Sequence, residues 1–330
     1  MQRWLKMLVL GLMAAVAAQG VAGTAARAAD TIIMGEVTRT SYQWPLWIGI
    51  AKGMFADLGL TIDEKFFTKP PESVQALSTN ATNLNYTVPV DSAVVAIAKE
   101  AKIVIIAGSQ EKLTYDLIAG PKYATMAALK GTTIGVSSLR SGSTVILHKM
   151  MRGNGLKYPS DYKLLELGGT PQRYAGVKTG GVSASVVAQP TSFQAEDDGL
   201  KILDTAARHI PLFAFTSIGV NIEWGKQNRD KVLRFLRGNA KALRWLEDEK
   251  NRAAAVQVLV KETRVAPKYA ERTYESNIKQ LKAFTPGGRI NLAAHQAVID
   301  LVVESGKLKQ ALPMSSLIDT SYIEEALKGL

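Results

Sequence analysis

Four consecutive residues shortly after the apolar run at 31–37 could bind the body of a small solute. Ser41, Tyr42, Gln43 and Trp44 place a hydroxyl, an amide and two aromatic rings near the end of the segment "TIIMGEV". Aromatic rings supply apolar contact area with a polar tip, and an amide can orient a polar ligand edge. The alternative is that Tyr42 and Trp44 only cap a strand and pack inside the protein.

The segment "SSLRSGST", residues 137–144, is the candidate anion site. Free N–H groups at a helix start bind anions, and a neighbouring guanidinium suits a carboxylate or sulfonate. The P-loop pattern with its lysine is absent, so the segment does not predict a nucleotide-phosphate site. Alternatively, the serines only cap a helix and the arginine points to solvent. The candidate residues are Ser138, Arg140, Ser141, Gly142 and Ser143.

Two further polar positions follow predicted strands. Asp91 and Ser92 come after "LNYTVPV", and Asp91 is predicted to N-cap the helix "SAVVAIAKEA", with a ligand contact as the alternative. Gln189 ends the strand "VSASVVA", where its amide could orient a ligand. A plain strand-to-helix turn, with Pro190 near the helix start, is the alternative there.

Residues typical of catalytic and metal sites are scarce. His148, His209 and His295 are isolated, without H-x-x-x-H or histidine and carboxylate spacing. The chain has no cysteine and no G-x-S-x-G elbow for a nucleophile. We therefore expect a binding protein with no catalytic residues, no metal and no cofactor.

The elements that must position these residues alternate between strands and helices. Apolar runs at 31–37, 61–67, 84–90 and 102–109 are separated by helical patterns, and a second set of such units follows Gly120. This alternation predicts an α/β protein with mainly parallel sheets flanked by helices. Ligands of such sheets bind outside the carboxyl ends of the strands, which is where the candidate residues lie.

The order of the units predicts two lobes. We expect residues 29–117 and 215–330 to form lobe 1 and residues 118–214 to form lobe 2, inserted into the first. Two crossings, near 113–120 and 208–218, would then form a hinge. The length of the chain accommodates both lobes.

The first 28 residues are predicted to be a signal peptide. A basic start, an apolar stretch at residues 7–23 and an A-x-A site at 26–28 are typical of export signals. The stretch is shorter than the roughly 20 consecutive apolar residues of a spanning helix, which is the alternative. We expect export to a periplasm-like compartment.

Composition excludes several partners. Without cysteine the chain has no disulfide framework and cannot carry a lipid thioether, so we expect no lipid anchor. The formal net charge of +11 comes from basic residues interspersed with acidic ones, which does not indicate nucleic-acid binding. We expect a monomer.

The segment "WPLWIGIAKGMFADLGLTID", residues 44–63, resembles a known pattern. It is similar to the P-L-x-x-A-x-x-K-G-x-F-x-x-x-G-L block of periplasmic binding proteins for nitrate, sulfonate and taurine ABC importers. Residues 171–203 resemble a second block of the same family. The resemblance implies two α/β lobes that close over a small solute and deliver it to a membrane permease driven by a cytoplasmic ATPase.

The residues favour a small organic anion, a sulfonate or carboxylate, held by Arg140 and covered by Tyr42 and Trp44. A thiamine-related pyrimidine is an alternative ligand for import. The same fold occurs in a pyrimidine-precursor synthase, which uses histidine and cysteine around its cleft, and the absence of cysteine opposes that interpretation. A module that presents its solute to a membrane sensor is a further alternative.

Overall fold

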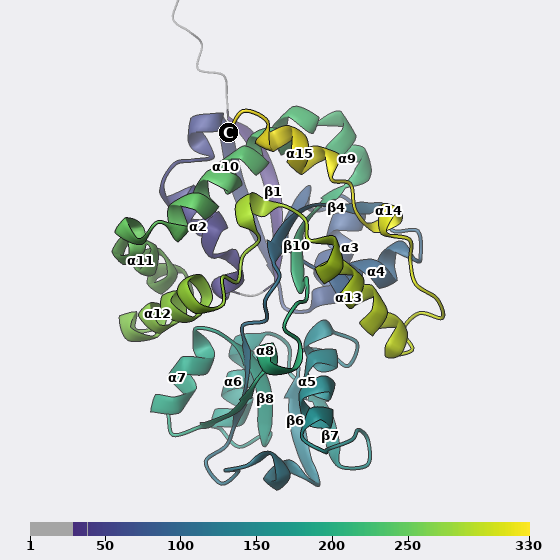
Figure 1. Cartoon of the computed structure of the whole chain (residues 1–330), viewed down its shortest axis with the longest axis vertical. Coiled ribbons are helices and arrows are strands. Elements are labelled where there is room, and N and C mark those ends of the chain that lie inside the picture. The colour runs from purple at the N-terminus through teal and green to yellow at the C-terminus, as the bar shows by residue number, and fades with distance from the viewer. Residues whose placement is uncertain (1–28, 38) are drawn as a thin grey trace, which may run out of the picture.

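The computed structural model describes residues 29–37 and 39–330, and the predicted signal peptide lies outside this part of the chain. The described chain forms two lobes, each built on one five-stranded sheet (Figure 1). The prediction of two α/β lobes is confirmed. Each sheet is mixed, because one of its five strands runs against its neighbours.

The sheet of lobe 1 has the strand order β2-β1-β3-β10-β4. Strands β2, β1 and β3 are parallel, whereas β10 is antiparallel to both β3 and β4. All residues of β3 and β10 are buried, as expected for central strands with both faces covered. The strands are β1 (Asp30–Val37), β2 (Leu60–Phe67), β3 (Leu84–Pro89), β4 (Ile103–Gln110) and β10 (Thr216–Asn221).

Helices cover both faces of this sheet. One face packs against α2 (Trp44–Ala51), α10 (Arg229–Glu247) and α15 (Ser321–Leu327). The other packs against α3 (Pro70–Ser78), α4 (Val90–Ile97), α13 (Leu292–Glu304) and α14 (Met314–Leu317). Outside these lie α9 (Ile222–Gln227), α11 (Arg252–Thr263) and α12 (Pro267–Tyr274).

The sheet of lobe 2 has the order β7-β6-β8-β5-β9, with β5 antiparallel to both neighbours. Its strands are β5 (Tyr115–Ala119), β6 (Thr132–Val136), β7 (Tyr162–Glu166), β8 (Ala184–Ala188) and β9 (Lys201–Thr205). Its helices are α5 (Gly142–Gly153), α6 (Thr170–Lys178), α7 (Thr191–Asp197) and α8 (Ala206–His209).

The two sheets are joined by two chain segments. The first, residues 111–114, links β4 to β5, so the predicted lobe boundary between residues 117 and 118 falls inside β5. The second, residues 210–215, leads from α8 into β10. The backbone N–H of Phe213 donates to the carbonyl of Glu111 at 2.9 Å, which ties the two segments together. One continuous apolar cluster passes through both of them.

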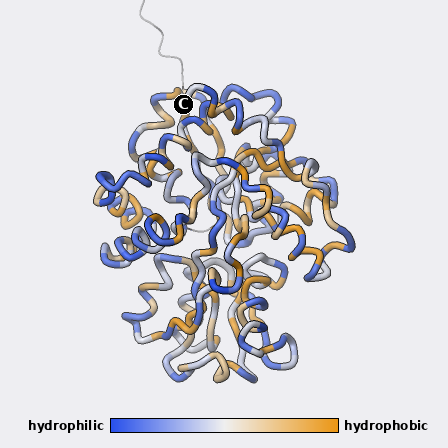
Figure 2. Tube along the Cα trace, in the orientation of Figure 1, coloured by the Kyte–Doolittle hydropathy of each residue, from blue (hydrophilic) through white to orange (hydrophobic). Residues whose placement is uncertain are grey.

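Surface helices have the mixed hydropathy expected of amphipathic elements (Figure 2). Within the described part of the chain, no helix combines the length and apolar character needed to cross a membrane.

Candidate functional site

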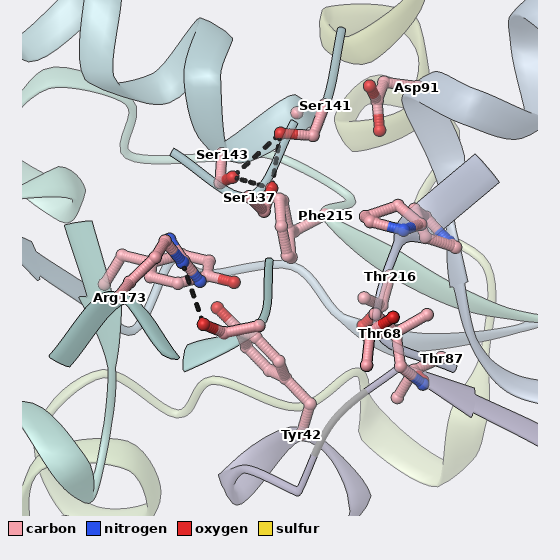
Figure 3. Close-up of a pocket in the computed structure, with 16 residues that line it drawn as sticks. Tyr42, Thr68, Thr87, Asp91, Ser137, Ser141, Ser143, Arg173, Phe215 and Thr216 are labelled. Carbon is pink, nitrogen blue, oxygen red and sulfur yellow. Dashed lines mark hydrogen bonds between the residues drawn. The ribbon is translucent and has the colours of Figure 1, made fainter. Parts of the chain in front are cut away.

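A small cavity of about 40 Å³ lies between the two lobes (Figure 3). Its walls lie where strands end: Val37 is the last residue of β1, Thr68 follows β2 and Ser137 follows β6. This is the position that parallel α/β sheets favour for ligands. Lobe 1 contributes Val37, Tyr42, Thr68, Thr87, Asp91 and Thr216, and lobe 2 contributes Tyr115, Ser137, Ser141, Gly142, Ser143 and Arg173.

Arg173 is a buried cation in the wall of this cavity. Only 2% of the residue is exposed, and its guanidinium donates to the carbonyls of Gly169 and Val186 and to the hydroxyl of Thr170. It also lies 5.6 Å from the ring centroid of Tyr115. All these partners are neutral, and no described carboxylate is within ion-pair distance. A buried charge without a counter-charge is costly, so the site favours an anion.

Three serine hydroxyls meet at the start of α5. The Oγ atom of Ser137 lies 2.6 Å from that of Ser141 and 2.7 Å from that of Ser143, and the last two are 3.0 Å apart. Ser141 occupies the N-cap position of α5, but its side chain makes no capping hydrogen bond. Ser137 donates to Ser141, and Ser141 donates to the carbonyl of Ser138, so Ser143 is the hydroxyl of the three whose proton can turn toward a ligand beside the positive end of the helix dipole.

Aromatic rings form the apolar wall of the cavity. Tyr42, Tyr115 and Phe215 contact one another, with ring centroids 5.2 to 5.8 Å apart. The hydroxyls of Tyr42 and Thr216 are buried and make no hydrogen bond of normal geometry to a described residue, although Thr114 lies near the Tyr42 hydroxyl. Burial raises the pKa of Tyr42 well above its ordinary value, so its hydroxyl keeps its proton and can donate.

Asp91 lines the cavity but does not cap α4. The helix begins at Val90 with Pro89 as its N-cap, so the predicted capping role of Asp91 is wrong. The carboxylate instead lies 3.3 Å from the ammonium of Lys307, which also donates to the carbonyl of Arg140 at 2.7 Å. Burial raises the pKa of Asp91 and the neighbouring lysine opposes that shift. Lys307 therefore partly neutralises this acid and links the lobes.

Three residues of the predicted "SYQW" site face the protein interior instead. Ser41 accepts from the side-chain amide of Asn277 at 3.1 Å, and Gln43 accepts from the backbone of Thr40 at 3.0 Å. Trp44 is fully buried and donates to the carbonyl of Ala255 at 2.9 Å. The reason is local, because Ser41–Gln43 form a 3-10 turn, η1, that directs only Tyr42 into the cavity.

Four other predicted residues lie outside the cavity walls. Arg140 is exposed and, with Ser92, lines a separate surface hollow. The carbonyl of Ser138 accepts from the hydroxyls of Ser141 and Thr144, which fixes the loop. Gln189 donates to Asp116 at 3.4 Å, and both residues line a different hollow from the cavity described above. Of the predicted residues, the structure thus keeps Tyr42, Asp91, Ser141, Gly142 and Ser143 in the cavity wall, but not Arg140.

Arg173 is the main residue that sequence reasoning missed. It lies in the first turn of α6, after a Thr-Pro start. A cation so close to a helix N-terminus opposes the helix dipole, and this mismatch was a detectable signal of a local anion. No comparable signal marks the other missed residues, because polar and aromatic residues in strands and just before them are common. These residues are Thr87, Tyr115, Phe215 and Thr216.

The histidines all have structural partners. His148 bonds to Tyr162 at 2.6 Å, His209 to Asp204 at 2.7 Å and His295 to Ser217 at 2.9 Å. Across residues 29–37 and 39–330, no three acidic or histidine side chains are grouped so that they could hold a metal ion.

The NMT1/THI5 like family model matches residues 40–253, well over half of the chain. The chain belongs to this family. The NMT1/THI5-like chain is also 29% identical over 133 residues to a Brachyspira hyodysenteriae protein that carries the name ABC transporter periplasmic binding protein. That match covers 40% of this chain and 37% of the relative.

Two solved structures share the fold of this NMT1/THI5-like protein. The nitrate-binding protein NrtA of Synechocystis PCC 6803 is 14% identical with a TM-score of 0.77, over 91% of this chain and 89% of that one. The alkanesulfonate-binding protein SsuA of Xanthomonas axonopodis pv. citri, bound to MOPS, is 17% identical with a TM-score of 0.68, over 90% and 97%. The resemblance drawn from residues 44–63 is confirmed for family and fold.

Proposed function

We propose that this protein is the solute-binding component of an ABC import system and captures a small organic anion between its lobes. It would act as an exported periplasmic monomer without a lipid anchor and deliver the anion to an inner-membrane permease driven by a cytoplasmic ATPase. The observation that carries the ligand class is Arg173, buried in the cavity wall without a described carboxylate partner.

The polar groups around Arg173 favour negative charge. The hydroxyl of Ser143, whose proton is not committed to another oxygen, and the hydroxyls of Tyr42 and Thr216 can donate to one ligand. Asp91 is the one acidic residue among those that line the cavity, and Lys307 offsets it. A carboxylate or sulfonate can accept two hydrogen bonds from a guanidinium at once, which favours these groups over a neutral ligand.

The aromatic wall supports an organic body on that anion. Tyr42, Tyr115 and Phe215 offer apolar contact that nitrate, which has no apolar part, could not use. A neutral thiamine-related pyrimidine could contact the rings, but it would leave the guanidinium of Arg173 without a counter-charge. We therefore rank a sulfonate or carboxylate above nitrate and above a pyrimidine.

Binding is a better interpretation than catalysis. A serine nucleophile requires an adjacent base, and each histidine of the chain is bonded to a partner other than the serine cluster. The pyrimidine-synthase alternative also lacks its cysteine. A sensor module would bind the same solute, and co-purification with a permease or with a kinase would separate the two roles.

A ligand panel tests the proposal. Thermal-shift measurements with ethanesulfonate, benzoate, nitrate and a neutral aminopyrimidine should show the largest stabilisation for an organic anion, because only a ligand that binds the folded state raises the melting temperature. A neutral pyrimidine as the best ligand would contradict the proposed ligand class.

A further inference from the structure

Glu36 is a fully buried acid directly behind a hydroxyl of the cavity wall. It lies on β1, and its Oε2 atom is 2.8 Å from the Oγ1 atom of Thr87, which lines the cavity from β3. The Thr87 hydroxyl also accepts from the backbone N–H of Val37 at 3.2 Å. One proton and one lone pair of this hydroxyl remain to be shared between Glu36 and the cavity.

The protonation state of Glu36 decides what Thr87 offers to a ligand. An ionised carboxylate can only accept hydrogen bonds. The Thr87 proton would then point at Glu36, and a lone pair of the Thr87 oxygen would face the cavity. A neutral acid can donate its own proton to Oγ1, which frees the Thr87 proton to point into the cavity. An anion requires a donor, so only the second arrangement suits the ligand class proposed above.

The surroundings of Glu36 favour the neutral acid. Its Oε1 atom has no hydrogen-bond partner of normal geometry among the described residues, so a negative charge there would be poorly stabilised. The groups around it are the amide of Gln43 from η1, Glu64 from β2, and Tyr86 with Thr87 from β3. None of these is a cation.

Nearby charge does not compensate an ionised Glu36. Arg39, three residues along the chain, is paired with Glu262, and the charged group among the main influences on Glu36 is the like charge of Glu64. Burial, the largest effect, and Glu64 raise the pKa of Glu36 well above its ordinary value, although hydrogen bonds from Thr87, from the Gln43 amide and from the Tyr86 backbone lower it. The direction of this shift agrees with the geometry.

We propose that Glu36 is a positioning residue that is kept as the neutral acid and turns the Thr87 hydroxyl into a donor for the bound anion. The inference rests on the proposed function, because it assumes an anionic ligand. Glu36 does not touch the ligand in this arrangement. It acts on specificity through Thr87, whose hydroxyl would repel the same anion if Glu36 were ionised.

Infrared difference spectroscopy tests the protonation state without a ligand. The spectrum of wild type minus that of Glu36→Gln, at neutral pH, should contain the carbonyl band of a protonated carboxylic acid. Other buried acids, such as Asp91 and Asp116, are present in both proteins and cancel. A carboxylate band in its place would overturn the proposal.

Calorimetric titration with ethanesulfonate tests the role in binding. Glu36→Gln should bind within about twofold of wild type, because a side-chain amide can donate to Thr87 as the neutral acid does. Thr87→Val should bind about tenfold more weakly, since it loses a hydrogen bond to a charged group, and Thr87→Ser should bind like wild type. Glu36→Gln binding tenfold more tightly would mean that wild-type Glu36 is ionised and would overturn the proposal.

The two experiments can give independent results, so a wrong ligand class and a wrong protonation state of Glu36 can be told apart. If wild type does not bind ethanesulfonate, the proposed ligand class is wrong, and the infrared band still decides the state of Glu36. If Glu36→Gln does not fold, carbon-13 NMR of the glutamate carboxyl groups in Thr87→Val and Thr87→Ser replaces it. The Glu36 signal should be that of a neutral acid in wild type and Thr87→Ser, and a carboxylate signal would overturn the proposal.

Discussion

Arg173 occupies a position that stability alone does not favour. Its guanidinium is buried near a helix N-terminus and has neutral oxygens as its partners. Desolvation of an unpaired charge costs several kcal/mol, and the helix dipole adds a smaller unfavourable term of about 0.3–1 kcal/mol. A bound anion would offset both costs, which is why we place the ligand charge here.

Glu36 leads to a prediction for stability against pH. Its folded-state pKa is raised well above the ordinary 4.5, so its contribution to stability is fully present below that value and is lost as pH rises toward the folded pKa. Glu36→Gln removes this loss. As the pH rises above the ordinary pKa of a glutamate, the free energy of unfolding of the variant should therefore increase relative to that of wild type, by up to about 1.4 kcal/mol per pH unit.

Urea unfolding of both proteins at several pH values measures this difference. Asp91 and Asp116 also have raised pKa values, but they occur in both proteins and cancel in the comparison. Parallel stability curves for wild type and Glu36→Gln would mean that Glu36 ionises normally in the folded protein.

At the scale of elements, the turn η1 (Ser41–Gln43) determines which aromatic residue reaches the ligand. Thr40 precedes it, and its hydroxyl accepts from the backbone N–H of Tyr42 while Gln43 bonds back to the Thr40 backbone. This reciprocal capping box fixes the turn. Trp44 is then the first residue of α2 and is directed into the core.

Thr40→Ala should therefore weaken both folding and binding. Loss of the capping hydroxyl should lower the free energy of unfolding by about 1 kcal/mol, and affinity for the anion should fall because Tyr42 is held less firmly. Thr40→Ser, which keeps the hydroxyl, is the matched control and should behave like wild type. Urea unfolding and calorimetric titration measure the two effects, and equal behaviour of both variants would contradict the role given to η1.

The sequence was sufficient to predict most elements, because strands such as β3 and helices such as α5 carry clear periodicity. Strand β5 was missed because its five residues are too few to show a clear hydrophobic pattern. They pair with β8 and β9, which are distant in the sequence. The site was predicted in part. Loop positions such as Ser141 follow from strand ends, but the depth of Arg173 and the exposure of Arg140 depend on packing between elements.

At the scale of the whole molecule, ion pairs join the lobes on both sides of the cavity. Asp197 and Glu196 of α7 pair with Lys268 and Arg272 of α12. Glu304 of α13 lies 3.2 Å from Arg152 and 3.5 Å from Lys149 of α5. These side chains are largely exposed, so salt should screen their attraction.

The ligand-free protein should consequently open as salt increases. Small-angle scattering should show a larger radius of gyration at high ionic strength, and saturating anion should reverse the change by closing the hinge. The double variant Lys268→Gln with Arg272→Gln should be open already at low salt. Lys279→Gln, which breaks a pair with Glu249 inside lobe 1, is the control and should stay closed. A radius independent of salt and ligand would indicate a rigid pair of lobes.

The measurement that tests the central claim most directly compares two arginines of lobe 2. Calorimetric titration with the best anion of the panel should show that Arg173→Met weakens binding by about 2 kcal/mol or more, roughly thirtyfold, because the buried anion loses its counter-charge. Arg140→Met, the matched change at the exposed arginine, should bind like wild type. Unchanged affinity in a folded Arg173→Met, or a loss confined to Arg140→Met, would contradict the account.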